Sequence, residues 1–545
     1  SRPHDRASVT ARTDSWTNSK TIFTFLFHAV KCLVRFSIQR IKVPVFIRSN
    51  RYADACRHLH LFPCLSTPFH PLCFPCPGDV TLVNENELQQ VIYNVLLMQI
   101  RFGTYHYGEH LPTLEEASQL FLVSIDTVRA AYLSLKQEGY ISLSRSVGAV
   151  VKVLYTRQET EQHIQDFYAL RKEGLIDVSR SMQPLFSHAL CIGFKNASPE
   201  TLDKILSLSS DSRFHPSHTM IRTLQYIYGS LNNDLLMRLV WRTFMSYQAP
   251  FLSIHRNIRY LEAEENPLVN MIELCRNQDW EALKTAVTDY QEYLSTALRS
   301  FCDSQIMTPP AGKQIDFHWY SYEKASQLRY SLGMEILISI NRGVYPAESF
   351  LPSLDKLSKE KHVSVSTVRR TLSLLNSIGV TKSINGLGTR VLPQEEMADN
   401  CELTHPIARR RLLDCAQGLQ IIALSCKDVA GLTAASLDSA ALCQIGERLD
   451  LLKHTGRYEL TAFTILEFFT HRAPSHAIRT AYAELLQHLM WGNPLRSMAA
   501  QAGINTASYL PYLEFFAGCV EKSDLTGFPE KLEELILFEF KLLLD

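Results

Sequence analysis

Two short clusters that combine hydroxyl groups with basic side chains recur 240 residues apart in this sequence. When the apolar residues between them are buried in a helix, these polar groups face solvent, where they can hydrogen-bond to phosphate oxygens and base edges. The members are Ser124, Thr127 and Arg129 in one cluster, and Ser364, Ser366, Thr367, Arg369 and Arg370 in the other. The chemistry that these residues indicate is recognition of nucleic acid.

Both clusters belong to a long internal repeat. Placing Gly103 on Gly343 aligns the following residues without a gap as far as Gly148 and Gly388, with fourteen identities at one constant offset. A constant offset over many identities indicates a duplicated module. We expect the first copy to cover residues 83–318 and the second copy to cover residues 319–545.

The second copy predicts three helices and a ribbon. Leu328, Leu332, Ile336 and Ile340 recur every four residues and form the stripe of a first helix. A second helix starts after Ser353, and a third helix covers 365–378, with caps from Ser353 and Ser364 and a stop at Gly379. Residues 380–384 and 388–392 predict two strands around a tight turn at 385–386.

This order is that of a winged helix, and its motifs resemble the GntR family of bacterial transcription regulators. The matching motifs are Leu351-Pro352-Ser353, Val363-Ser364-Val365-Ser366-Thr367-Val368-Arg369 and Gly386-Leu387-Gly388-Thr389. The resemblance covers about seventy residues in each copy. It implies a third helix in the DNA major groove and a wing on neighbouring phosphates. The DNA-contact residues that we add to the two clusters are Lys361, Gly388, Thr389, Arg390 and Arg145.

The sequence also departs from the family pattern. The family usually places an arginine that touches DNA two positions after the Leu-Pro-Ser serine, where Glu115 and Asp355 stand in this chain. The arginine that commonly follows the turn serine is replaced by Ile125 and Val365. These losses weaken the expectation that both copies read an operator in the usual way.

Local charge distinguishes the two copies. The whole chain is neutral, with 55 basic and 55 acidic residues, so binding to DNA requires a local basic patch. Residues 354–392 contain seven bases and two acids, whereas residues 114–152 contain four of each. Because phosphate contacts supply most of the affinity for DNA, we expect the second copy to dominate binding. The first copy also lacks the first glycine of the wing, at Ser146.

Long apolar-periodic stretches follow each winged helix and predict helical bundles, with segments such as 231–245, 270–301 and 477–490 each forming a helix. The resemblance implies that such bundles sense a small effector and form dimers. His215, His218 and His255 lack the repeated spacing of a helical metal site, so we expect no metal and no cofactor in the first bundle. Cys415, Cys426 and Cys443 of the second bundle are expected to be buried apolar groups.

The first 82 residues differ in composition from the rest. They hold five cysteines and hardly any acid. We expect a disordered leader, or a start assigned too far upstream. The alternative is a zinc knuckle formed by Cys73 and Cys76 with Cys56, His58 or His60. Its longest apolar run, 21–36, is interrupted by His28, Lys31 and Arg35 and is too short and polar to span a bilayer.

The sequence therefore predicts a mainly α-helical protein with two winged helix-turn-helix domains, each followed by a bundle. The expected domains are 1–82, 83–155, 156–318, 319–394 and 395–545. The expected function is a bacterial, cytoplasmic and nucleoid-associated transcription regulator that binds double-stranded DNA at paired half-sites, with a small-molecule effector and a homodimer as possible partners. The alternative is a replication-initiator-like or protein-interaction module with a degenerate first copy. No motif of an enzyme active site is present.

Overall fold

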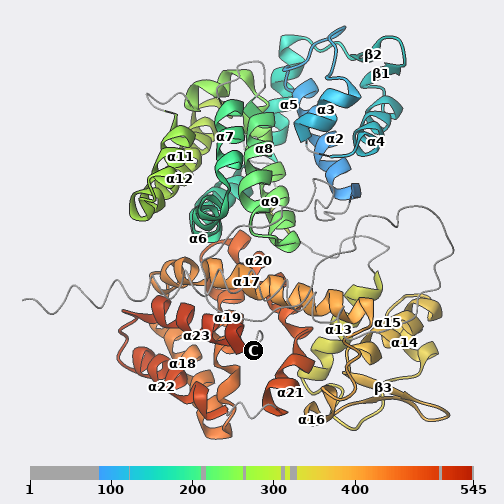
Figure 1. Cartoon of the computed structure of the whole chain (residues 1–545), viewed down its shortest axis with the longest axis vertical. Coiled ribbons are helices and arrows are strands. Elements are labelled where there is room, and N and C mark those ends of the chain that lie inside the picture. Colours follow the sequence, from blue (N-terminus) through green and yellow to red (C-terminus); the bar gives the residue numbers. More distant parts are fainter. Residues whose placement is uncertain are drawn as a thin grey trace, which may run out of the picture. The chain divides into compact units, whose positions relative to one another are not determined.

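The computed structural model describes residues 85–542, apart from residues 122, 210–215, 262–265, 308–313, 320–327 and 502–505. The leader, with its Cys73 and Cys76 pair, lies outside the described residues. The described chain is mainly helical and contains two antiparallel two-stranded ribbons (Figure 1). No helix in this part of the chain is long and apolar enough to cross a membrane.

The first head, residues 85–151, is a winged helix. Its elements are α2 (Glu85–Arg101), α3 (Leu114–Phe121), α4 (Ile125–Gln137), β1 (Ile141–Ser144) and β2 (Gly148–Val151). Val95, Leu96, Val128 and Leu135 are fully buried at the contacts between these helices. Val128 and Leu135 are seven residues apart, which is two helical turns, so they lie on the same apolar face of α4.

The second head, residues 328–391, repeats this arrangement. Its elements are α13 (Leu328–Asn341), α14 (Leu354–Glu360), α15 (Val365–Ser377), β3 (Thr381–Ile384) and β4 (Gly388–Val391). The predicted helices and strands are confirmed to within a few residues, and Ser353 and Ser364 cap α14 and α15 as expected. One detail of the predicted stripe is wrong, because Leu328 is 42% exposed at the start of α13.

The described residues of the first bundle, within 157–305, form helices and the turns between them. The helices are α5 (Arg157–Ala169), α6 (Lys172–Asn196), α7 (Pro199–Ser209), α8 (Pro216–Gly229), α9 (Asp234–Ser246), α10 (Gln248–Leu252), the 3-10 helix η1 (His255–Leu261), α11 (Pro267–Arg276) and α12 (Trp280–Gln305). The stretch 270–301, predicted as one helix, is two helices. Gln278 takes a positive φ of 57° and Asp279 caps α12, which separates the two apolar stripes.

The second bundle, residues 394–542, is also helical. It contains α16 (Gln394–Met397), α17 (Pro406–Ala434), α18 (Ser439–Thr455), η3 (Tyr458–Leu460), α19 (Thr461–Arg472), α20 (His476–Met490), α21 (Asn493–Gln501), η4 (Thr506–Tyr509), α22 (Leu510–Glu521) and α23 (Phe528–Leu542). Cys415 and Cys426 are buried, and burial raises the pKa of Cys415 to about 12. The expectation for Cys443 is wrong, because this residue is exposed on α18.

The two bundles contact each other through α6 of the first bundle and α17 and α20 of the second. The carboxylate of Asp177 on α6 caps α20, accepting hydrogen bonds from the backbone N–H groups of His476 at 3.1 Å and Ala477 at 2.8 Å. Asn233 donates to the carbonyl of Gln417 on α17 at 2.9 Å. Buried polar contacts need matched geometry, so they fix the register between the two copies.

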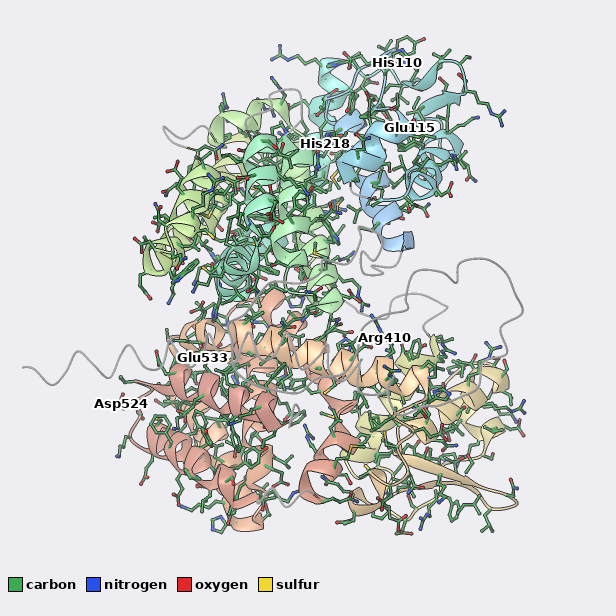
Figure 2. All side chains as sticks on the ribbon, viewed as in Figure 1. His110, Glu115, His218, Arg410, Asp524 and Glu533 are labelled. Atoms are coloured by element: carbon green, nitrogen blue, oxygen red, sulfur yellow. The ribbon has the colours of Figure 1, made fainter. Side chains whose placement is uncertain are left out.

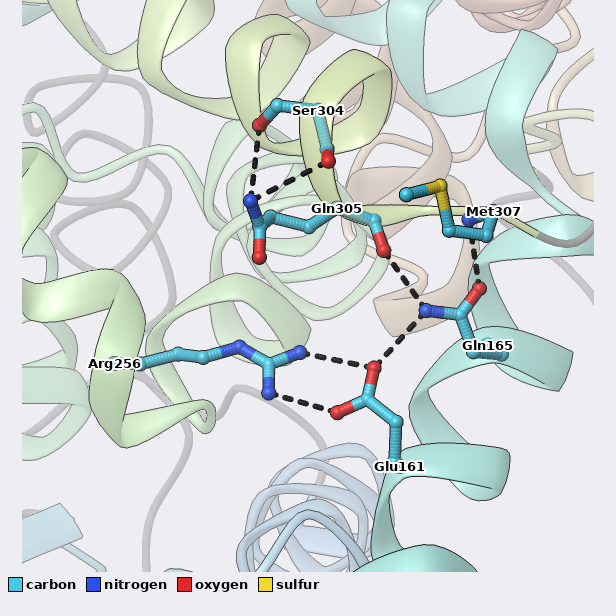
Figure 3. Close-up of polar contacts among 6 residues, drawn as sticks. All are labelled: Glu161, Gln165, Arg256, Ser304, Gln305 and Met307. Carbon is cyan, nitrogen blue, oxygen red and sulfur yellow. Dashed lines mark hydrogen bonds and ion pairs between the residues drawn. The ribbon is translucent and has the colours of Figure 1, made fainter.

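The first head is held to the first bundle by one buried and one partly buried hydrogen bond. Gln99 on α2 donates to Ser217 Oγ on α8 at 3.0 Å, and Gln225 donates to the carbonyl of Phe121 at 2.8 Å. The connecting helix α5 is held as well, because Arg256 makes a two-pronged ion pair with Glu161, at 2.7 and 3.0 Å (Figure 3). The pKa of Glu161 is lowered chiefly by this hydrogen bond to Arg256.

The far end of α5 is tied to the end of α12. Gln165 donates to the carbonyl of Gln305 at 2.9 Å and accepts a hydrogen bond from the N–H of Met307 at 2.9 Å (Figure 3). The head and the bundle of the first copy are therefore connected by a helix that is anchored at two successive turns, by Glu161 and by Gln165.

Candidate DNA-binding surfaces

The helix-turn-helix of both copies is closed by the same two hydrogen bonds. Ser118 donates to the carbonyl of Val123 at 2.6 Å, and Ser358 donates to the carbonyl of Val363 at 2.5 Å. After the turn, Ser124 Oγ accepts from the N–H of Thr127 at 3.1 Å, and Ser364 makes the same N-cap in the second copy. These small hydroxyl side chains thereby set the angle at which the third helix of each head leaves the turn.

The third helix of the second head, α15, presents an open basic surface. Val368, Leu372 and Leu375 are buried beneath it, while Ser366, Arg369 and Arg370 are exposed. Within the described part of the chain, the two guanidinium groups make no ion pair and no side-chain hydrogen bond. The guanidinium groups are therefore available to phosphate oxygens or to guanine in a major groove.

Two other basic side chains of the second head form ion pairs with acidic residues of the same chain. Arg390 forms ion pairs with Glu348 at 2.6 Å and with Glu396 at 2.8 Å, and its side chain is only 23% exposed. Lys361 pairs with Glu335, and the hydrogen bond to this carboxylate is the main reason that the pKa of Lys361 is raised. The three acids lie outside residues 354–392, so counting charges along that segment overstates the basic excess that the surface presents.

Of the two wing residues predicted to contact DNA at the start of β4, one is exposed and the other is buried. Gly388 is exposed at the start of β4, with a φ of 122° that favours glycine. Thr389 is 8% exposed and its hydroxyl lies 3.2 Å from that of Ser383 on β3. The threonine hydroxyl therefore links the two strands of the ribbon.

In the first head the corresponding helix, α4, presents less available charge. Arg129 is paired with Asp126 one turn earlier, where the second copy has Ser366. Thr127 is 4% exposed and its hydroxyl lies 2.8 Å from that of Ser124. Glu115 on α3 is exposed on the same head and adds negative charge (Figure 2). Arg145 at the tip of the ribbon is exposed.

The two wings have the same register despite the missing glycine. Ile141 pairs with Val151 and Ser144 with Gly148 in the first ribbon, as Thr381 pairs with Val391 and Ile384 with Gly388 in the second. Loss of the first wing glycine has therefore not removed the ribbon. Both ribbons share a glycine with positive φ at the start of the second strand.

The two residues that cap α3 in the first head were not identified from the sequence. Thr113 and Glu116 form a reciprocal cap at the start of α3, with the Thr113 N–H donating to the Glu116 carboxylate at 2.8 Å. The Thr-x-x-Glu spacing is the signal that predicts this cap. The partners of Lys361 and Arg390 had no such signal, because each acid is distant in sequence or lies on another element.

Each bundle contains a cavity. The cavity of the first bundle has a volume of 320 Å³ and is lined by apolar and uncharged polar side chains, including Phe186, Leu294 and Gln291. None of the described residues that line it is charged. The Oε1 atoms of Gln248 and Gln291, two of the lining residues, are buried without a hydrogen-bond partner.

The cavity of the second bundle has a volume of 560 Å³ and is charged. Arg496, Tyr509 and Glu539 are among its lining residues. Burial raises the pKa of Glu539 to about 7, and the nearby Arg496 opposes this effect. The linings of the two cavities therefore differ in charge.

The histidines considered for a metal site in the first bundle are not brought together as a described site. His218 is buried, and its ring lies against that of Phe121 at 5.3 Å between centroids, which joins the first head to α8 (Figure 2). His255 is exposed on η1, and His215 lies outside the described residues.

Comparison with known proteins identifies both heads. Residues 88–151 and 331–391 match the sequence model of the bacterial regulatory proteins of the gntR family. No curated protein matches the chain. Among solved structures, the chain is similar to a Streptococcus agalactiae GntR protein, with 13% identity and a TM-score of 0.17, covering 39% of this chain and 97% of that chain.

Two further solved structures show similar values. Escherichia coli McbR/YncC is 16% identical, with a TM-score of 0.20, and the match covers 40% of this chain and 98% of that chain. A transcriptional regulator of the GntR family from Pseudomonas syringae pv. tomato str. DC3000 is 21% identical, with a TM-score of 0.18, covering 40% of this chain and 88% of that chain.

Proposed function

We propose that the two heads of this chain read paired half-sites on one duplex. The chain is a GntR-type DNA-binding transcription regulator, because residues 88–151 and 331–391 both match the DNA-binding region of the gntR family. The observation that carries this proposal is the polar contact between the copies through α6, α17 and α20. A fixed contact between the bundles limits the distances at which the two heads are presented.

The linkage also supplies affinity. Once the second head binds through Arg369 and Arg370, the first head searches for its half-site at a high effective concentration and needs little affinity of its own. The pairing of Arg129 with Asp126 is compatible with such a secondary role. Half-sites one helical turn apart, about 34 Å, suit a pair of recognition helices on one face of the duplex.

Selection of bound duplexes from a random pool with the full chain tests this proposal. We expect enrichment of two half-sites at one fixed spacing. Inserting half a helical turn, about 5 base pairs, between them should reduce affinity on the order of tenfold or more, because the heads then face opposite sides of the duplex. Inserting a full turn is the matched control. Enrichment of one unpaired half-site would contradict the proposal.

The alternative is that only the second head binds DNA and the first is an interaction module. The reduced charge of α4 and the exposed Glu115 favour this version. In that case the selected sites hold a single half-site, and Arg145→Ala leaves affinity unchanged. Occupancy spread broadly over a genome, or clustered at origins, would favour a role in replication or assembly over regulation.

Control by an effector forms the second part of the proposal. The uncharged cavity of the first bundle, with its unpartnered glutamine acceptors, suits an apolar ligand that carries a hydroxyl or amide donor. Such a ligand changes affinity for DNA only if it binds one arrangement of the heads better than another.

Thermal unfolding of the full chain with 1-decanol and with decylamine tests the ligand class. We expect decanol to raise the unfolding temperature and the charged amine to have a smaller effect, since no described lining residue can neutralise it. Leu294→Trp, which fills the cavity, should abolish the decanol effect. An equal response of the Trp variant and the unaltered chain would overturn this assignment.

A further inference from the structure

Three side chains with metal-binding groups meet where the two copies are joined. They are Asp316 and His318, on the connector between the copies, and His476, the first residue of α20. One ligand atom from each side chain lies within 4.8 Å of the other two. The two imidazole rings are 5.3 Å apart between centroids and almost perpendicular, at 87°.

The connector presents its two ligands on one side. Residues 314–319 belong to no helix or strand, and burial alternates along residues 316–319: Phe317 and Trp319 are 6% and 3% exposed, whereas Asp316 is exposed and His318 is half-buried. This alternation, together with the closeness of the ligand atoms of Asp316 and His318, places these two side chains on the side away from the buried rings. The buried aromatic side chains therefore hold the ligand pair in a fixed orientation.

The backbone of the connector is also held. The N–H of Ile315 donates to the carbonyl of Leu170 at 2.7 Å, and Arg242 donates to the carbonyl of His318 at 2.9 Å. At Gly174 on α6 an added Cβ would lie 2.8 Å from the carbonyl oxygen of Ile315. Glycine at this position permits the close approach that brings the connector alongside α6.

We propose that Asp316, His318 and His476 form a binding site for a divalent ion of the zinc class. Two imidazoles and a carboxylate are ligands that Zn²⁺ accepts, with a water molecule completing a tetrahedron. Ligand atoms in such a tetrahedron are roughly 3.4 Å apart, given bonds of about 2.0–2.1 Å. The ligand atoms lie within 4.8 Å of one another, so each separation must shorten by at most about 1.4 Å, which rotation of the side chains can supply.

The local charges favour a cation at this position. His476 stands at the N-terminus of α20, where the helix dipole contributes about half a positive charge. Asp177 caps the same helix end, and Asp316 faces it from the connector. The two carboxylates outweigh the helix dipole and the guanidinium of Arg242, which donates to the backbone carbonyl of His318. Thr480 Oγ1, 3.4 Å from His476 Nε2, is positioned to orient that ring as an outer-shell partner.

An ion in this site would fasten the connector to α20 at the point where α6 of the first copy caps that helix. Its effect is on the junction between the copies and not on either recognition helix. The site therefore extends the proposed function without depending on it, and its occupancy is measured without DNA.

Titration of the chelator-treated full chain with Co²⁺, followed by displacement with Zn²⁺, tests the site. We expect one ion per chain that shows ligand-field absorption without sulfur-to-cobalt charge transfer, because the ligands are nitrogen and oxygen. Asp316→Asn and His476→Gln should each weaken this binding on the order of tenfold or more. Zn²⁺ should slow hydrogen exchange at the N–H groups of His476 and Ala477.

His110→Gln, on an exposed histidine of the first head, is the matched control and should bind the ion unchanged (Figure 2). Circular dichroism checks that the variants fold, and Asp316→Asn is the safer variant because this side chain is exposed. Binding that shows sulfur-to-cobalt charge transfer and persists in both ligand variants would place the ion on cysteines elsewhere and overturn the proposal. Absence of binding would also overturn it.

Discussion

At the scale of single residues, neutralising partners decide which bases are available to DNA. Arg369 and Arg129 occupy equivalent positions of the repeat, but only Arg129 has an acid one turn before it, at Asp126. An ion pair on an exposed surface contributes little stability, yet it reduces the positive charge that a phosphate meets. The two heads therefore differ more in available charge than in shape.

Replacing Arg369 and Arg370 together with alanine should weaken DNA binding and reduce the slope of log affinity against log salt by about two, one for each lost phosphate contact. Arg129→Ala should change the slope by less than one. Fluorescence anisotropy at several salt concentrations measures both, with Lys522→Ala on the exposed end of α22 as control. Equal slopes for the two heads would refute the asymmetry.

Arg390→Ala should lower the free energy of unfolding. Loss of its two ion pairs should cost about 1 kcal/mol of unfolding free energy, since both partner carboxylates remain partly exposed and can be solvated. The salt slope of DNA binding should stay the same. Urea denaturation and anisotropy measure the two effects, and a lower slope with unchanged stability would show that Arg390 contacts DNA.

At the scale of elements, the same turn glycine has different surroundings in the two copies. Gly139 and Gly379 both end a recognition helix with positive φ, at 83° and 75°. A Cβ at Gly139 would meet nothing within 4 Å, whereas a Cβ at Gly379 would lie 2.3 Å from the carbonyl oxygen of Met397. The second head is thus packed against the chain that follows it.

Gly139→Ala should therefore cost roughly 1–2 kcal/mol, the strain of a left-handed alanine. Gly379→Ala adds a steric clash to this strain and should cost clearly more. Chemical denaturation of the two variants compares the costs directly. Equal losses would mean that the segment carrying Met397 moves away without penalty.

The charged cavity of the second bundle predicts a pH dependence. Burial raises the pKa of Glu539 from 4.5 to about 7, so the folded chain holds a proton there that the unfolded chain has lost. Stability should fall as pH rises from about 4.5 to about 7. Glu539→Gln removes this titration, so the free energy of unfolding of the variant should not show this decrease. At pH 8 the variant should therefore be more stable than the unaltered chain by up to about 3 kcal/mol. Matched denaturation curves at pH 4.5 and pH 8 measure it. A difference that is the same at both values would contradict the assignment.

At the scale of the whole molecule, the contact between the bundles connects the two heads. Asp177 accepts two N–H groups at the start of α20, and its loss leaves that helix end without a cap from the other copy. Charge-assisted hydrogen bonds of this kind are stronger than neutral ones.

Asp177→Ala should therefore weaken binding to paired half-sites while leaving binding to a single half-site unchanged, because the heads themselves are intact. Asp289→Ala, on an exposed aspartate of α12, is the control. Anisotropy with one-site and two-site duplexes separates the effects. An equal loss on both duplexes would show that Asp177 supports a head and not the pairing of heads.

The sequence by itself determined the repeat, the winged helices and their caps. These features depend on local signals: apolar periodicity, Ser364 before a helix, Gly379 after one and a turn at Gly386. Such signals are read within a few residues, so one copy is enough to predict them and the second copy confirms them.

Only the tertiary structure decided which charges are available and how the copies meet. The acids that neutralise Lys361 and Arg390 come from other elements, the cap that Asp177 provides crosses from one copy to the other, and His476 meets His318 only after both bundles have folded. Contacts between residues far apart in the chain depend on packing, which no local spacing encodes.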